Sequence, residues 1–172
     1  GLETGTAPIL EQVTEITAEL LRYWFQVDFK DTRVINYHSG QRQAILNTIY
    51  AHEVIKPKTL FDLYNTVCPE LLLDRGKANR EVNAPKNNYP KYCLSMATGT
   101  GKTWVLQALL LWQLLNANRN REDERFTKNF LLVAPGLIVY ERLLDALMGK
   151  ERSGERSFET SDLAIYQELF IP

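Results

Sequence analysis

Two short apolar runs, each followed by a turn and then by a helical pattern, organise this chain. The first run covers residues 92–96 and the second covers 130–134. Between them, residues 103–115 are apolar on almost every face, which predicts a buried helix. Glycine-containing turns end the runs at 97–101 and 135–136. This order of elements predicts two parallel strands joined by a right-handed helical crossover, and therefore an α/β fold.

The first part of the chain carries helical patterns instead. Residues 6–26 place apolar side chains at helical spacing, which predicts an amphipathic helix. A second helix is expected over 40–54, with Ser39 as its N-cap. We expect a helical segment at 1–35 and a domain from 36 to 172.

A polar stretch near residues 74–91 interrupts that domain. It contains turn residues and no hydrophobic period, and it holds more basic than acidic residues. We expect an insertion that forms a solvated surface loop, and a loop that contacts DNA is the alternative.

The turn after the first run reads Met-Ala-Thr-Gly-Thr-Gly-Lys-Thr, residues 96–103, which we call the phosphate loop. Gly99 and Gly101 can adopt positive φ and let the main chain approach an anion. Successive N–H groups and the start of the next helix then attract phosphate. Lys102 can reach the β- and γ-phosphates, and the Thr103 hydroxyl can bind Mg²⁺.

The sequence of the phosphate loop departs from the general pattern G-x-x-x-x-G-K-[ST], because Met96 occupies the position of the first glycine. In this form it resembles motif I of superfamily 2 helicases and translocases, above all the motor subunits of type I and type III restriction enzymes. The resemblance covers residues 36–148. It implies a partial RecA-like domain with a parallel sheet, preceded by N-terminal helices.

The same resemblance implies a function. The chain would be the ATP-binding, N-terminal fragment of a DNA-dependent ATPase that translocates along double-stranded DNA, with or without an endonuclease activity. ATP and Mg²⁺ are the implied cofactors, with Lys102 and Thr103 as the catalytic pair. The expected nucleotide-binding residues are Gln41, Thr98, Gly99, Thr100, Gly101, Lys102 and Thr103.

Two further segments resemble motifs of these motors. Gly-Gln-Arg-Gln-Ala-Ile at 40–45 resembles the segment that reads adenine, which implies Gln41 as the reader and Gln43 as the next candidate. Pro135 and Gly136 stand where motif Ia holds nucleic-acid phosphates, and Arg142 follows in the next helix. An ordinary surface helix and an ordinary strand-to-helix turn are the alternatives.

No carboxylate in the sequence follows an apolar strand, the position from which it would hold Mg²⁺. Asp123 and Glu124 lie in a charged run with no apolar strand before it, so we expect a solvated loop there. Asp162 precedes its apolar residues instead of following them. We therefore expect a chain truncated before the Walker B motif and inactive alone. Another enzyme with a phosphate loop, such as a nucleotide kinase, and a non-catalytic nucleotide sensor remain alternatives.

Composition adds a few limits. Hydrophobic residues make up 45% of the 172 residues and the net charge is −1, so any DNA contact must be local. Cys68 and Cys93 form no metal-binding pair, and His38 and His52 have no ligand partners at metal spacing. No apolar run suits a membrane. We expect a cytoplasmic protein. The resemblance to the motors of restriction enzymes implies a methyltransferase or specificity subunit as a further partner.

Overall fold

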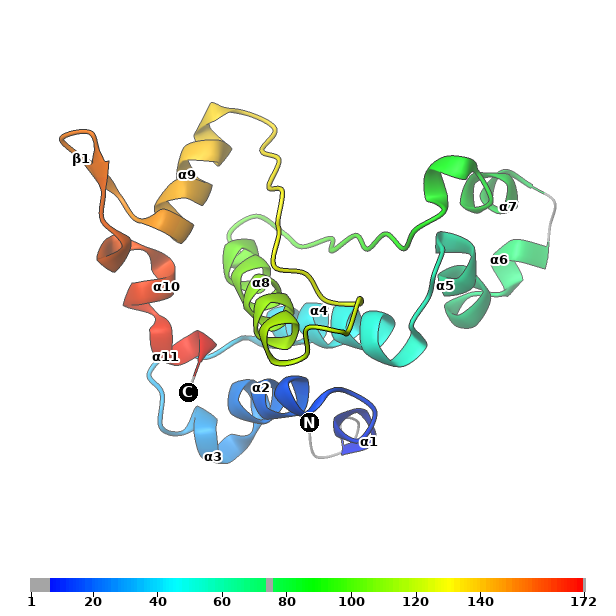
Figure 1. Cartoon of the computed structure of the whole chain (residues 1–172), viewed down its shortest axis with the longest axis horizontal. Helices are drawn as coiled ribbons and strands as arrows, with labels where there is room; N and C mark the ends of the chain where they lie inside the picture. Colours follow the sequence, from blue (N-terminus) through cyan, green and yellow to red (C-terminus); the bar gives the residue numbers. More distant parts are fainter. Residues whose placement is uncertain (1–6, 74–75, 172) are drawn as a thin grey trace. The chain divides into compact units, whose positions relative to one another are not determined.

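The computed structural model describes residues 7–73 and 76–171 (Figure 1). The chain forms two compact units. The first unit combines the residues up to Ile45 with those from Met96 onward, and the second comprises Leu46–Ser95. These units do not test the predicted boundary between an N-terminal segment at 1–35 and a domain at 36–172, which stays a prediction.

The N-terminal helical segment is divided. A short helix, α1 (Ala7–Leu10), precedes α2 (Glu15–Phe25) and α3 (Val27–Lys30). The single helix expected over 6–26 is therefore wrong, and its first residue lies outside the described part. Thr14 explains the break, because its side chain accepts a hydrogen bond from Thr17 N and caps α2.

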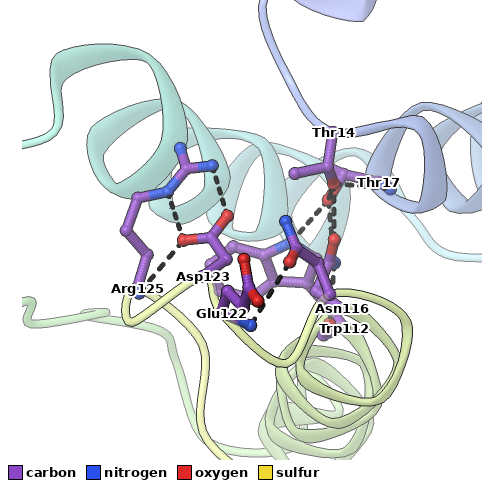
Figure 2. A network of polar contacts seen from close by, with 8 residues as sticks. Thr14, Thr17, Trp112, Asn116, Glu122, Asp123 and Arg125 are labelled. Carbon is purple, nitrogen blue, oxygen red and sulfur yellow. Dashed lines mark hydrogen bonds and ion pairs between the residues drawn. The ribbon is translucent and has the colours of Figure 1, made fainter.

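The helix predicted over 103–115 is confirmed as α8 (Lys102–Arg119). Its burial on almost every face is not, because Leu106, Leu109 and Leu110 are only half-buried. The helix packs against α2 through a buried polar network (Figure 2). Thr17 Oγ1 accepts hydrogen bonds from Trp112 Nε1 at 2.9 Å and from Asn116 Nδ2 at 3.0 Å. Because all three side chains are buried, this network fixes how the two helices meet.

The C-terminal part of the first unit returns to α2. The indole Nε1 of Trp24 donates to the carbonyl of Phe170 at 2.8 Å, and Tyr37 packs edge-on against both rings. This aromatic cluster forms much of the core. The elements here are α9 (Leu137–Met148), β1 (Glu151–Arg152), β2 (Glu155–Arg156), a 3₁₀ turn at Phe158–Thr160, α10 (Asp162–Ile165) and α11 (Gln167–Phe170).

Helix α4 (Ser39–Ile49) runs from the first unit into the second. The second unit then holds short helices. They are a π-helix at Tyr50–Ile55, α5 (Leu60–Val67), α6 (Glu70–Leu73), α7 (Lys77–Val82) and a 3₁₀ turn at Pro85–Asn87. The polar stretch at 74–91 thus contains α7, although residues 74 and 75 are outside the described part. Its role as an insertion stays a prediction.

The predicted parallel sheet is wrong. In the described residues the strands are β1 and β2, which pair antiparallel in a two-stranded hairpin. Residues 92–96 and 130–134 are extended but belong to no sheet (Figure 1). An apolar run becomes a strand only when a neighbour satisfies its main-chain groups. Leu131 and Val133 are instead 89% and 81% exposed. Because the regular elements of the described residues are helices apart from the β1–β2 hairpin, the described fold is mainly helical and not RecA-like α/β.

Candidate functional site

The phosphate loop has the main-chain conformation that its glycines were expected to allow. Gly99 has φ of 80° and Gly101 has φ of 66°, both in the left-handed region. Gly101 is the N-cap of α8, and no side chain caps that helix start. The N–H groups of Lys102 and Thr103 therefore start α8 without a side-chain acceptor, in a position where the helix dipole favours negative charge.

The ammonium of Lys102 folds back on the phosphate loop. Its Nζ donates to the carbonyl of Met96 at 2.9 Å and to that of Ala97 at 2.8 Å. Thr100 Oγ1 donates to the same Ala97 carbonyl at 2.7 Å. Lys102 remains exposed, so a ligand in solution can compete with these carbonyls for its charge.

The other two threonines of the phosphate loop differ in exposure. Thr98 is exposed at the outer turn of the loop, and Thr103 is half-buried in the first turn of α8. The structure thus brings together Thr98, Gly99, Thr100, Gly101, Lys102 and Thr103, all the nucleotide-binding residues predicted in the loop.

Gln41 joins them from α4. Its Nε2 donates to the Gly101 carbonyl at 3.2 Å, and its Oε1 accepts from His38 N at 3.0 Å. The side chain is 2% exposed, so the alternative of a glutamine on a solvated face is wrong. Its role as the adenine reader stays a prediction. The next candidate, Gln43, is exposed.

His38 is the residue of this site that the sequence interpretation missed. Its Nε2 lies 3.1 Å from the Thr100 carbonyl, and its Nδ1 accepts from Gly40 N at 3.0 Å and from Gln41 N at 3.4 Å. His38 therefore caps α4, which begins at Ser39. The prediction that Ser39 is the N-cap is therefore wrong. Gly40, two residues after His38, is only a weak sequence signal for this cap, because glycine leaves room for the ring.

Of the acidic residues outside the loop, Asp123 pairs with an arginine side chain (Figure 2). Arg125 forms two hydrogen bonds with the carboxylate of Asp123, Nε to Oδ1 at 2.9 Å and Nη2 to Oδ2 at 2.6 Å. The Asp123 side chain is only 12% exposed, so a solvated loop is wrong at this residue, although Glu124 is exposed. Within the described residues, no three His, Cys, Asp or Glu side chains gather to hold a metal.

The second predicted site, for nucleic acid, lies at the start of α9. Pro135 and Gly136 form an exposed bend, and α9 begins at Leu137 without a side-chain cap. Arg142 is exposed on the following turns. These features leave the turn accessible, and DNA contact there stays a prediction.

The site is thus a glycine-containing loop that leads directly into α8, with Lys102 and Thr103 as the first two residues of that helix. The chain belongs to the family of the type III restriction enzyme res subunit, whose family model matches residues 35–167. Membership of this family of helicase-like ATPases confirms the resemblance. Comparisons with curated proteins and with solved structures gave no match. Among the described helices, none is long and apolar enough to cross a membrane.

Proposed function

We propose that the phosphate loop binds the phosphates of ATP and that the complete protein uses ATP hydrolysis to translocate along double-stranded DNA. The observation that carries this proposal is the loop conformation. Two glycines at positive φ lead into the uncapped start of α8, with Lys102 as its first residue. This arrangement suits a polyphosphate, which needs closely spaced N–H donors and a mobile cation.

Binding would release Lys102 from its two carbonyl partners. Moving the ammonium to the β- and γ-phosphates replaces neutral acceptors with charged ones, and charge-assisted hydrogen bonds are the stronger kind. The hydroxyl of Thr103, one residue further along α8, is the group that would hold Mg²⁺. The residues present therefore fit a magnesium-bound nucleotide.

Turnover needs a further carboxylate to orient water near the metal ion. Asp123 is engaged by Arg125, and Asp162 lies in the first turn of α10. We propose that the 172-residue chain binds ATP without hydrolysing it, and that hydrolysis belongs to the complete motor.

For the nucleic acid, we propose the turn at Pro135 and Gly136, with Arg142 as an additional phosphate contact. The exposed bend and the uncapped start of α9 support it, because N–H groups at a helix start bind phosphate oxygens. The complete protein would also associate with a methyltransferase or specificity subunit.

Calorimetric titration with ATP and Mg²⁺ tests the nucleotide proposal. Lys102→Ala should weaken binding by about 1.5–3 kcal/mol, the range for a hydrogen bond to a charged group. Lys128→Ala removes an exposed lysine outside the loop and should bind as the parent does. Equal affinity of Lys102→Ala and the parent would refute the assignment of the loop.

A further inference from the structure

We propose that His38 is a positioning residue for the phosphate loop, holding the peptide between Thr100 and Gly101 in the orientation that receives phosphate. This inference rests on the proposed nucleotide function and deepens it. The observation behind it is the Nε2 contact with the Thr100 carbonyl at 3.1 Å.

The geometry of the peptide bond explains how this contact acts. In a trans peptide, the carbonyl and the following N–H point in opposite directions. Because the Thr100 carbonyl faces His38, the Gly101 N–H faces away from it. The Gly101 carbonyl likewise receives Gln41 Nε2 and Trp104 N, which turns the Lys102 N–H away from α4. Residues at the start of α4 thus direct two consecutive N–H groups outward together.

The hydrogen bonds of the imidazole assign its protonation form. Nδ1 accepts from two main-chain N–H groups, of Gly40 and Gln41, so it carries no proton. Nε2 faces a carbonyl oxygen and must donate. Only the neutral ring with its proton on Nε2 makes all of these contacts, because each ring nitrogen either donates or accepts. His38 therefore links the capped start of α4 to the loop through one rigid ring.

Gly40 provides an independent sign that the ring position is specified. A Cβ at this residue would lie 3.1 Å from Cε1 and 3.3 Å from Nδ1 of His38, tighter than ordinary van der Waals contact. The missing side chain lets the imidazole lie over the first turn of α4 and still reach Thr100. A methyl group there would push the ring, although alanine favours the helix itself.

Three variants separate positioning from capping. His38→Asn keeps a good N-cap but is too short for Thr100, so its melting temperature should stay near the parent value. Its ATP dissociation constant should rise about three- to tenfold, as expected for one lost hydrogen bond. Gly40→Ala should weaken ATP binding in the same direction without lowering the melting temperature. Ser39→Ala, at an exposed neighbour, should leave both unchanged.

Nitrogen NMR of the ATP-free chain provides a readout that does not depend on nucleotide. The ring of His38 should show a protonated Nε2 and a bare Nδ1, and His38→Asn should shift the Gly101 amide resonance. A ring protonated on Nδ1, or an unchanged Gly101 resonance, would overturn the positioning role even if ATP binds. If the ring and Gly101 behave as expected but neither parent nor variant binds ATP, the nucleotide proposal fails and the positioning of the loop stands.

Discussion

The Nε2 of Gln41 donates a hydrogen bond to the Gly101 carbonyl at 3.2 Å, from a side chain that is only 2% exposed. This bond joins the first turn of α4 to Gly101, the N-cap residue of α8. Gln41 is therefore part of the structural support of the phosphate loop.

Replacing this glutamine should destabilise the fold. In Gln41→Ala, the buried amide and its two hydrogen bonds are lost, so the free energy of unfolding should fall by about 1–3 kcal/mol. Urea unfolding followed by circular dichroism measures the change. Gln43→Ala, at an exposed position on the same helix, should stay within about 0.5 kcal/mol of the parent. Equal stability of Gln41→Ala and the parent would show that the contact contributes nothing.

The two loop glycines should differ in their tolerance of alanine. Both have positive φ, so each substitution should cost about 1–2 kcal/mol in main-chain strain. A Cβ at Gly99 meets nothing, whereas one at Gly101 would overlap Gln41 Nε2. Gly101→Ala should therefore be the more destabilising variant. In a Gln41→Ala background its excess cost should shrink, and a purely additive double-mutant cycle would contradict this geometry.

The polar network between α2 and α8 should be sensitive to a single oxygen atom. Thr17→Val keeps the shape of the side chain but removes the acceptor for Trp112 Nε1 and Asn116 Nδ2. Because buried donors lose their acceptor, unfolding free energy should fall by about 1–3 kcal/mol. Thr32→Val changes an exposed threonine and serves as the control. If both variants unfold at the same urea concentration, the network does not stabilise the packing.

If α9 contacts DNA phosphates, Arg142→Ala should weaken duplex binding about equally for unrelated sequences. The dependence of the logarithm of affinity on the logarithm of salt concentration should lose about one unit of slope. Fluorescence anisotropy with labelled duplexes at several salt concentrations measures both. Arg121→Ala, at an exposed arginine in the turn that follows α8, is the matched control. An identical loss in both variants would point to nonspecific charge attraction instead of a site.

The local features of the phosphate loop were predictable from sequence, because glycine conformations and a helix start depend on neighbouring residues. Gly99, Gly101 and α8 follow those rules. The N-cap of α4 was not predictable in this way, because serine is the usual cap and an isolated histidine carries no strong signal. Only the fold reveals that Thr100 lies beside His38.

The predictions of a parallel sheet and of a solvated loop at Asp123 were wrong for a related reason. Apolar content predicts a strand, but strand formation depends on partners that sequence alone does not place. Residues 130–134 are extended, and all of them except Ala134 are exposed, because they pair with no strand among the described residues. Asp123 looked solvated in a charged run, yet Arg125 two residues later binds it and shields it.

Mapping amide resonances during titration with ATP and Mg²⁺ tests the central claim most directly. If the phosphate loop binds the nucleotide phosphates, the largest shifts should fall on Gly99, Gly101, Lys102 and Thr103, and Lys102→Ala should remove most of them. The amides of the β1–β2 hairpin, at Glu151–Arg152 and Glu155–Arg156, should stay in place. Shifts centred elsewhere, or a loop whose resonances do not move at millimolar ATP, would contradict the account.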